Sequence, residues 1–478
     1  MTIALILFTI IGLLGAFDTL YHHEFKERLP WRPEVKEELV VHAIRNFFYA
    51  ILFLSLAWVE WHGVLAWIFL AMLVTEVFVT FWDFALEGKV RDVPAPEIIV
   101  HGLLGIVYGA ALAFLVPEIF AWSEQTTSFT FVEHGIFSII MSVYALSVFI
   151  FAFRDYFRSQ EVENFKQTYV MSLEEKEQNI LVTGGSGFIG SKVAQALIDD
   201  GHMVTVLTRD FNKSIKKFSK QVTLVETLDE VKQDFDVILN FAGESINQKW
   251  TERSKEAILK SRVEVTNSVL DYIKRVEIKP KLLISSSGTG IYPASETEAF
   301  TELSTFETKG FLAEVCQQWE SIAKEAENYG IRMVPLRTGL VLGIDGGVLA
   351  EMLTPFDLCL GGKLGNGKQI MPWIDMQDML GIVEKVINDE NIKEAVNATA
   401  PKPVSNEVFS KALAKTLHRP AFLTTQPFML NALFGKEMTA DILLSGRAVL
   451  PLKIEEAGYE FKFKTIESSM NNLFNNEG

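Results

Sequence analysis

Long apolar runs mark the first third of the chain, and shorter ones mark the rest. The long runs occupy Thr2–Tyr21, Leu39–Val59, Val64–Trp82, Ile98–Trp122 and Gly135–Phe153. The length of each run is near the ~20 residues that an α-helix needs to cross the hydrocarbon core of a bilayer. The pattern predicts an all-α transmembrane helix bundle of about five helices in residues 1–158.

Lysines and arginines gather in alternate connections between these runs. They are Lys26, Arg28, Arg32 and Lys36 after the first run, Lys89 and Arg91 after the third, and Arg154, Arg158 and Lys166 after the fifth. The connections 60–63 and 123–134 contain neither residue type. The positive-inside rule therefore predicts an integral protein of a bacterial-type cytoplasmic membrane, with its amino terminus outside and all residues after Arg154 in the cytoplasm.

Short apolar segments alternate with amphipathic stretches in the remainder of the chain. Residues 159–178 are polar and charged, which indicates a juxtamembrane linker. The predicted strands are Asn179–Thr183, Met203–Thr208, Asp236–Phe241, Lys281–Ser286, Met333–Arg337 and Ala395–Thr399, and the predicted helices include Ser191–Asp200, Glu252–Lys274 and Phe311–Asn328. This alternation predicts a Rossmann-type α/β domain with a doubly wound parallel sheet over residues 179–400.

A glycine-rich turn follows the first of these strands, with the sequence GGSGFIG at residues 184–190. Gly184 permits a tight turn, Gly187 lets backbone amides approach a pyrophosphate, and Gly190 allows the helix to pack closely on the sheet. Phe188 and Ile189 open the helix, whose amino end favours an anion. The order of strand, glycine turn and helix predicts a dinucleotide-binding site that includes these five residues.

The end of the next strand indicates which dinucleotide is preferred. An acidic residue there binds the ribose 2′-hydroxyl of NAD, whereas a basic residue accepts the 2′-phosphate of NADP. The strand ends in Thr208, Arg209 and Asp210. Arg209 therefore favours NADP, and Asp210 keeps NAD open as the alternative.

Ionisable residues recur near the ends of the predicted membrane helices. They form the pairs Asp18/His22, Glu38/His42, Asp83/Glu87 and Glu97/His101, with His23, Arg45 and Glu76 nearby. Each pair is spaced i,i+4, so both members share a helix face. One interpretation is a carboxylate–histidine metal site within the bundle, held by Asp18, His22, Glu38, His42, Glu97 and His101. The alternative is a set of charges at helix ends that pair with one another and with lipid headgroups.

Composition narrows the classes of partner. The 478 residues carry a formal net charge of -16, which argues against broad binding to the phosphates of nucleic acid. The two cysteines, Cys316 and Cys359, form neither a disulfide framework nor a zinc motif. The expected partners are a small-molecule substrate and the lipid bilayer, with no nucleic acid.

The motifs of the Rossmann part resemble, in their order, those of the extended short-chain dehydrogenase/reductases. Within that superfamily the runs FAGESI, SSSGTGIYP, FLAEVCQQWE and PWIDMQD resemble an atypical epimerase-family branch, also described as NAD-dependent epimerase/dehydratase-like. The resemblance covers about residues 178–474. It implies cofactor contacts by Ala242, Gly243 and Ser285, and a small carboxy-terminal substrate domain over residues 401–478.

The chain departs from the superfamily in its catalytic pair. Typical members use a tyrosine with a lysine four residues later, whose charge lowers the tyrosine pKa for proton transfer. No tyrosine here has a lysine at that spacing, and the corresponding helix carries instead candidates such as Glu320. The resemblance places a substrate-facing hydroxyl at Ser287, and Tyr292 in the adjoining loop could supply a phenol. These two are the candidate catalytic residues.

Three functions agree with these features. The first is a membrane-anchored, NADP-linked oxidoreductase or epimerase-like enzyme that acts on an unidentified small molecule by hydride transfer. The second, favoured by the missing tyrosine–lysine pair, is a catalytically silent NADPH-binding sensor or regulatory module. The third, favoured by the carboxylate–histidine pairs, is a metal- or quinone-linked membrane redox protein, with a quinone or a membrane protein as partner.

Overall fold

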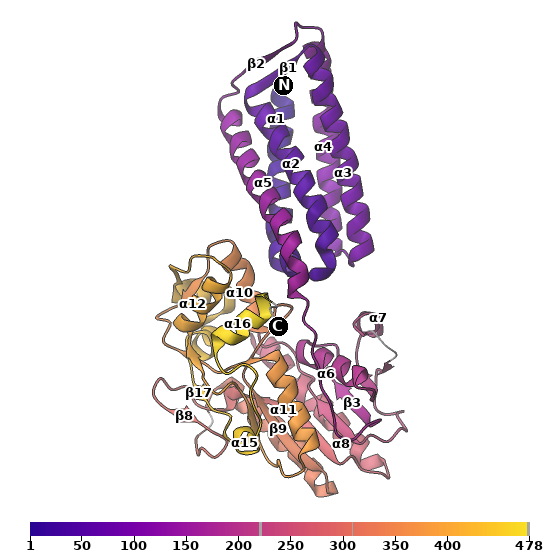
Figure 1. Cartoon of the computed structure of the whole chain (residues 1–478), viewed down its shortest axis with the longest axis vertical. Helices are drawn as coiled ribbons and strands as arrows, with labels where there is room; N and C mark the ends of the chain where they lie inside the picture. The colour runs from indigo at the N-terminus through magenta and orange to yellow at the C-terminus, as the bar shows by residue number, and fades with distance from the viewer. Residues whose placement is uncertain (219–221, 308, 476–478) are drawn as a thin grey trace. The chain divides into compact units, whose positions relative to one another are not determined.

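The chain folds into two compact units, Met1–Lys166 and Gln167–Gly478 (Figure 1). The computed structural model describes residues 1–218, 222–307 and 309–475. The boundary differs from the predicted linker at 159–178, because residues 159–165 continue the first unit and the following stretch packs on the second. Met171 and Leu173 are buried in the core of the second unit, and the Leu173 amide donates a hydrogen bond of 2.8 Å to Asp200 Oδ2.

Five long helices build the first unit. They are α1 (Thr2–Phe17), α2 (Lys36–Trp58), α3 (Val64–Val90), α4 (Ala95–Ser123) and α5 (Ile136–Glu161). The π-helical turn η1 (Asp18–Lys26) extends α1, and the 3₁₀ turns are η2 (Leu29–Trp31), η3 (Pro33–Val35) and η4 (Val162–Phe165). The strands β1 (Val59–His62) and β2 (Ser128–Phe131) pair antiparallel beyond the ends of the helices.

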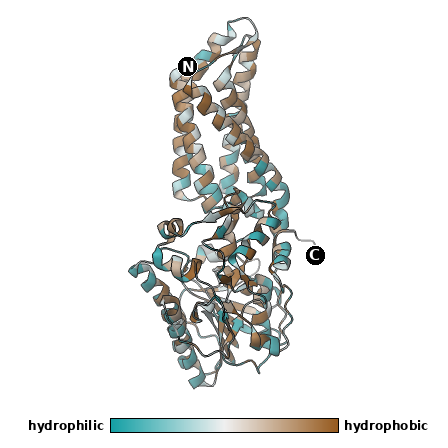
Figure 2. Cartoon of the chain, turned by 90° about the vertical axis from the view of Figure 1, so that its left-hand side faces the viewer, coloured by the Kyte–Doolittle hydropathy of each residue, from teal (hydrophilic) through white to brown (hydrophobic). Residues whose placement is uncertain are grey.

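These helices have the length and composition of membrane spans. With their adjoining turns they cover Thr2–Trp31, Pro33–Trp58, Val64–Val90, Ala95–Ser123 and Ile136–Phe165. Leu5, Phe53 and Leu115 are buried between them, while Phe78 and Ile106 are among the large apolar side chains that face outward. Figure 2 shows hydrophobic residues along most of the length of the five helices. Five helices are therefore long and apolar enough to cross a bilayer, in agreement with the sequence pattern.

A parallel sheet forms the centre of the second unit. Its seven strands are β3 (Asn179–Thr183), β4 (Met203–Leu207), β5 (Thr223–Val225), β6 (Val237–Asn240), β7 (Leu282–Gly288), β9 (Arg332–Thr338) and β14 (Val396–Ala398). They lie in the order β14-β9-β7-β6-β3-β4-β5 with every pair parallel. The strand order reverses at β3. Doubly wound sheets bind ligands in the crevice that such a reversal forms at the carboxyl ends of the strands. The predicted fold class is confirmed.

Helices flank the sheet and follow its strands. They are α6 (Phe188–Asp199), α7 (Phe211–Ile215), α8 (Glu252–Arg275), α9 (Phe311–Lys324), α10 (Gly347–Asp357) and α11 (Met376–Asn388), with 3₁₀ turns η5 (Thr289–Ile291) and η6 (Glu325–Tyr329). Buried apolar residues such as Val182, Leu197 and Val383 form one core against the sheet. Their burial explains why apolar residues alternate with polar ones along these helices.

The carboxy-terminal residues pair with segments that precede residue 400. Strand β15 (Val404–Ser405) pairs with β12 (Ile370–Met371), β16 (Leu423–Thr425) with β11 (Gly362–Leu364), and β17 (Ala448–Val449) with β8 (Ala299–Phe300). The remaining elements are β10 (Leu340–Leu342), β13 (Trp373–Asp375), α12 (Asn406–Thr416), α13 (Pro427–Phe434), α14 (Lys436–Met438), η7 (Thr439–Leu443), α15 (Leu452–Glu456) and α16 (Ile466–Asn475). The predicted domain over 401–478 is thus part of the second unit, and its residues 476–478 lie outside the described part.

We predict that the two connections of the first unit without Lys or Arg lie on the side of the membrane opposite to the second unit. A reporter fused after Thr126, between α4 and β2, and one fused at Gly478 should report opposite compartments, with the second cytoplasmic. Activities of a paired periplasmic and cytoplasmic reporter at each site would measure this. Two fusions that report the same compartment would contradict the orientation.

Candidate functional site

The glycine turn after β3 is built by close backbone contacts. Gly184 has a φ of 67°, and a Cβ atom there would lie 2.7 Å from the Ala242 nitrogen. A Cβ atom on Gly190 would lie 2.3 Å from the Gly184 carbonyl oxygen, so the helix α6 meets the turn without room for a side chain. Gly187, by contrast, is exposed. It is the N-cap residue of α6 and provides no side-chain cap, so the first amides of the helix are available to an anion.

Around this turn, the predicted cofactor residues differ in their exposure. Phe188 and Ile189 are half-buried, and the Phe188 ring occupies the space beside Gly343 and Gly346. Ala242 lies beside the turn, where its amide donates a hydrogen bond of 3.2 Å to Thr183 Oγ1. A Cβ atom on Gly243 would lie within about 3 Å of the Arg262 guanidinium, so this glycine makes room for that side chain.

Ser285 lies beneath the crevice rather than on its wall. It is buried, and its hydroxyl accepts a hydrogen bond of 3.1 Å from the Asn240 amide. Asn240 in turn accepts from Thr183 Oγ1 at 2.7 Å. These side chains tie together β3, β6 and β7, so Ser285 stabilises the strand ends on which the site is built.

Arg209 follows β4 at the open side of the crevice. Its side chain is 91% exposed, and its Nη2 atom lies 3.8 Å from Glu244 Oε2. Glu244 directly follows Gly243 after β6. Arg209 is therefore an exposed cation near the strand ends that border the glycine turn. Its contact with Glu244 is a loose ion pair.

Ser287, at the end of β7, belongs to a hydrogen-bonded group of polar side chains. Its hydroxyl donates to Glu320 Oε1 at 2.7 Å. Arg337 on β9 donates to both oxygens of the same carboxylate, from Nε and Nη2, each at 2.9 Å. This bidentate pair fixes the Glu320 carboxylate in one orientation. Ser287 is thereby held with its hydroxyl hydrogen directed at an anion.

Tyr292 contributes to the same group from the buried side. Its ring is 1% exposed and packs between Phe300 and Phe306. Its hydroxyl accepts from Arg337 Nη1 at 2.9 Å and donates to Asn397 Oδ1 at 2.8 Å, and burial raises the pKa of this phenol. The prediction that Tyr292 meets the substrate disagrees with this burial. Tyr292 is a positioning residue for Arg337.

One face of helix α9 packs against the residues that follow Ser287. Leu312, Cys316 and Glu320 share this face at intervals of four residues. A Cβ atom on Gly288 would lie 3.5 Å from Cys316 Sγ, and one on Gly290 would lie 3.2 Å from Leu312 Cβ. Burial raises the pKa of the Cys316 thiol. Leu312 and Cys316 are therefore four residues apart, which is the spacing of the tyrosine–lysine pair, and they lie near Ser287 on this face.

Arg447 is a residue of the site that the sequence alone did not reveal. It lies between η7 and β17, and its Nη1 atom is 3.5 Å from the carbonyl oxygen of Thr289, just beyond β7. Its Nε atom is buried and makes no hydrogen bond among the described residues. No motif surrounds Arg447 in the sequence, and backbone contacts with distant segments bring it to the end of the sheet, among them the pairing of β17 with β8 and a hydrogen bond of 3.0 Å from the Arg447 amide to the Ile370 carbonyl oxygen.

The ionisable residues of the first unit also gather, and one predicted i,i+4 pair, Glu97 and His101, lies within a single group. Ligand atoms of Asp18, His23, Glu97 and His101 lie within 4.8 Å of one another, and so do those of His23, His42 and Glu87. Glu38 instead accepts hydrogen bonds from Arg91 Nε at 3.0 and 3.3 Å. His22 Nδ1 lies 2.8 Å from Asp18 Oδ1, outside both sets. His23 and Glu87 take the places predicted for His22 and Glu38.

Comparison with known proteins identifies the second unit. Residues 180–398 match the NAD dependent epimerase/dehydratase family, and residues 427–473 match a domain of unknown function, DUF1731. The chain is 36% identical over 307 residues to the chloroplastic epimerase family protein SDR39U1 homolog of Arabidopsis thaliana, covering 63% of this chain and 87% of the relative. The chain belongs to the NAD-dependent epimerase/dehydratase family. Both family matches lie in the second unit. They do not reach the first unit, so the fusion of this family's domain to a membrane domain stays a prediction.

Further relatives of this epimerase/dehydratase chain agree. The epimerase family protein YfhF of Bacillus subtilis is 35% identical, over 62% of this chain and 97% of the relative. The structure of human epimerase family protein SDR39U1 (isoform 2) with NADPH has a TM-score of 0.57 and 29% identity, covering 62% of this chain and 99% of that one. A nucleoside-diphosphate sugar epimerase from Corynebacterium glutamicum has a TM-score of 0.51 and 25% identity, covering 72% of this chain and 67% of that one.

Two glycines of the turn should respond differently to an added methyl group. Gly190→Ala forces the turn or the helix to shift and should cost about 1–3 kcal/mol, or roughly 2–8 °C in Tm. Gly187→Ala meets only the Gly184 carbonyl, at 3.1 Å, and should leave the Tm nearly unchanged. Thermal unfolding of the full chain in detergent would measure both. Equal losses in the two variants would contradict the described packing.

Proposed function

We propose that the chain is a membrane-anchored, NADP-linked oxidoreductase or epimerase-like enzyme that acts on a small molecule by hydride transfer. The observation that carries this proposal is the placement of the Ser287 hydroxyl at the same end of the parallel sheet as the open glycine turn. The family membership supports a nicotinamide cofactor. The five apolar helices of the first unit support an anchor in the bilayer, with the second unit in the cytoplasm.

The glycine turn and Arg209 support the choice of cofactor. The uncapped amides at the start of α6 suit a pyrophosphate, and the absence of a side chain on Gly187 lets it approach them. Arg209 is exposed and within reach of the strand ends where an adenosine ribose binds in such sheets. A 2′-phosphate would replace the loose contact of Arg209 with Glu244 by a charge-assisted one. The human relative's structure with NADPH agrees with this preference.

Ser287 and Glu320 support a route for the proton. A bound nicotinamide supplies or accepts the hydride at the reacting carbon. The Ser287 oxygen is free to accept a hydrogen bond from a substrate hydroxyl, because its own hydrogen points to Glu320. As the hydroxyl is oxidised, its proton passes to Ser287 Oγ while the serine proton passes to Glu320, and a reduction reverses both transfers. Arg337 keeps the carboxylate oriented, and this arrangement takes over the task of the missing tyrosine–lysine pair.

Arg447 indicates the substrate class. Its guanidinium lies next to the end of β7 and has an unpartnered Nε atom. A half-buried guanidinium of this kind is best satisfied by an anion that offers two oxygens, such as a carboxylate or a phosphate, which arginine binds through two parallel hydrogen bonds. We therefore propose that the substrate carries a carboxylate or phosphate group. Arg262, whose guanidinium lies 5.1 Å from the centre of the Trp319 ring, adds a second positive charge near Cys316.

A silent NADPH-binding module is the second candidate. Leu312 and Cys316 favour it, since neither side chain at the tyrosine–lysine spacing transfers protons readily. The two functions differ in turnover. The enzyme oxidises bound NADPH in the presence of its substrate, whereas the module binds NADPH without oxidising it. The enzyme proposal stands independently of any metal in the membrane unit.

The full chain, purified in mild detergent, should bind NADPH at least about tenfold more tightly than NADH, because Arg209 gains a charged partner only from the former. Arg209→Ala should remove the preference, whereas Arg253→Ala, which removes a different arginine of this unit, should keep it. Fluorescence titration with both cofactors would measure the affinities. Equal affinities in the unmutated chain would contradict the role of Arg209.

Turnover separates the enzyme from the module. A panel of small carbonyl compounds with and without a carboxylate or phosphate should reveal NADPH oxidation only with anionic members. Ser287→Ala should reduce kcat by about 100-fold or more, and NADPH affinity should stay the same. Oxidation that is unaffected in Ser287→Ala would exclude the serine relay, and bound NADPH that no member of the panel oxidises would favour the sensor.

A further inference from the structure

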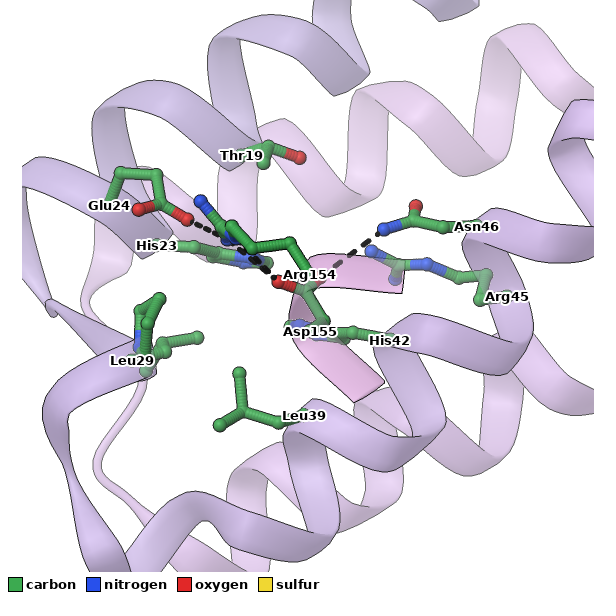
Figure 3. A pocket seen from close by; sticks show the side chains of 11 residues that line it. Thr19, His23, Glu24, Leu29, Leu39, His42, Arg45, Asn46, Arg154 and Asp155 are labelled. Atoms are coloured by element: carbon green, nitrogen blue, oxygen red, sulfur yellow. Dashed lines mark hydrogen bonds and ion pairs between the residues drawn. The ribbon is translucent and has the colours of Figure 1, made fainter. Parts of the chain in front are cut away.

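Four segments of the membrane unit bring histidines and carboxylates together in its interior. Asp18 and His23 come from η1, His42 from α2, Glu87 from α3, and Glu97 and His101 from α4. We refer to these six residues as the histidine–carboxylate cluster. Each of the six is buried. Figure 3 shows one flank of it, where His23 and His42 lie near Arg45, Arg154 and Asp155.

Two imidazole nitrogens of the cluster have no hydrogen-bond partner. The side chains of His23 and His42 are 5% and 4% exposed, and the Nε2 atom of each makes no hydrogen bond within the described residues. His23 Nε2 lies 3.3 Å from Glu97 Oε1, and His42 Nε2 lies 3.3 Å from Asp83 Oδ1. Glu87 Oε1 and Asp83 Oδ1 likewise have no hydrogen bond there. Buried polar atoms of this kind are costly unless something binds them.

Buried carboxylates and arginines surround the cluster. The carboxylates are Asp18, Glu24, Glu38, Asp83, Glu87, Glu97 and Asp155, and the arginines that pair with them include Arg45, Arg91 and Arg154. The rings of His23 and His42 stack, with centroids 4.6 Å apart and planes within 4° of parallel.

The spacing of the cluster matches ligands that share one ion. Bonds of about 2.0–2.2 Å at tetrahedral or octahedral angles separate neighbouring donor atoms by about 2.9–3.5 Å. His101 Nε2 lies 3.1 Å from Asp18 Oδ2, and His23 Nε2 lies 3.3 Å from Glu97 Oε1 and 3.7 Å from Asp18 Oδ2. On the other side, His42 Nε2 and His101 Nδ1 each lie 3.5 Å from an oxygen of Glu87. The His101–Asp18 contact has the length of a hydrogen bond, and the other contacts, at 3.3–3.7 Å, are longer than one. All but the longest also have the separation expected of atoms that bind one ion.

Neighbouring side chains already orient the ligands. Arg91 donates to both oxygens of Glu97, at 3.0 and 2.6 Å. His22 is hydrogen-bonded to the other oxygen of Asp18 at 2.8 Å, and the His101 ring stacks on Phe84 at 4.6 Å. Such outer contacts are typical of protein metal sites, where they fix the ligating atoms before the ion arrives.

We propose that the histidine–carboxylate cluster binds a divalent transition-metal ion, with His23 as the ligand common to both sets. Its two sets, Asp18/His23/Glu97/His101 and His23/His42/Glu87, offer imidazole and carboxylate donors. Imidazole nitrogen together with carboxylate suits Mn²⁺, Fe²⁺ or Zn²⁺, whereas Cu⁺ prefers sulfur and Ca²⁺ prefers six or more oxygens. Because His23 is common to both sets, we propose that they form alternative parts of one site and that the unit holds a single ion.

The test is the metal content of the full chain in mild detergent. The protein would be stripped with a chelator, reloaded separately with Mn²⁺, Zn²⁺ or, without oxygen, Fe²⁺, desalted, and measured by elemental analysis. We expect about one ion per chain for at least one metal, and less than about a tenth in His23→Ala and His23→Gln. His62→Ala is the matched control, since His62 is a buried histidine of β1 bonded to Glu60 and Thr130, and should retain the ion.

Thermal unfolding shows whether a variant lost the metal only because it misfolded. The metal should raise the Tm of the unmutated chain and of His62→Ala, and should leave that of His23→Gln unchanged, because a ligand stabilises only a state that binds it. Each variant is compared with its own metal-free form, because the loss of the His62 hydrogen bonds can itself lower the Tm. A content near zero for all three metals in the unmutated chain, or full retention in His23→Gln, would overturn the proposal. Two ions per chain would overturn the single shared ligand.

Discussion

A charged side chain removed from water needs an opposite charge or a ligand, and both units are arranged around this constraint. In the second unit the Glu320 carboxylate is satisfied within the protein, because Arg337 pairs with both of its oxygens and Ser287 donates to one of them. Loss of Arg337 alone would leave this largely buried carboxylate without its opposite charge. The pair therefore joins α9 to β9, and it fixes the orientation of the Ser287 hydroxyl. In the first unit, buried histidine and carboxylate atoms without hydrogen-bond partners are the reason to expect a cation.

The sheet was predictable because its signals are local. Each buried strand is a short apolar run between polar or glycine residues, and the turn after β3 needs glycine at positions where a Cβ atom would strike the backbone. The residues beside Ser287 were harder to predict. Arg447 reaches the site through backbone contacts with distant segments, among them the pairing of β17 with β8, and the burial of Tyr292 depends on Phe300 and Phe306, which are distant from any motif. Contacts of this kind depend on the folded topology and leave no periodic pattern in the sequence.

The histidine ligands show a more specific limit. The i,i+4 spacing of an α-helix predicts that His22 shares a face with Asp18, and the two side chains are hydrogen-bonded at 2.8 Å. Residues 18–26 form a π-helical turn, and His23 Nε2 also lies 3.7 Å from Asp18 Oδ2. The wider turn thus brings a second histidine near Asp18, which the α-helical repeat does not predict. The five spans were less sensitive, since apolar length does not depend on the exact helical repeat. Met171 and Leu173 pack an otherwise polar stretch into the core of the second unit, and the composition of that stretch does not indicate this.

Two independent ligands are proposed for one chain, a nicotinamide dinucleotide in the second unit and a metal ion in the first. The most direct test measures both on the same purified samples of the full chain, by NADPH titration and elemental analysis. We predict that His23→Gln loses the metal and binds NADPH as the unmutated chain does, and that Gly187→Ala weakens NADPH binding and keeps the metal. Loss of both ligands in either folded variant, or the presence of neither in the unmutated chain, would contradict the account.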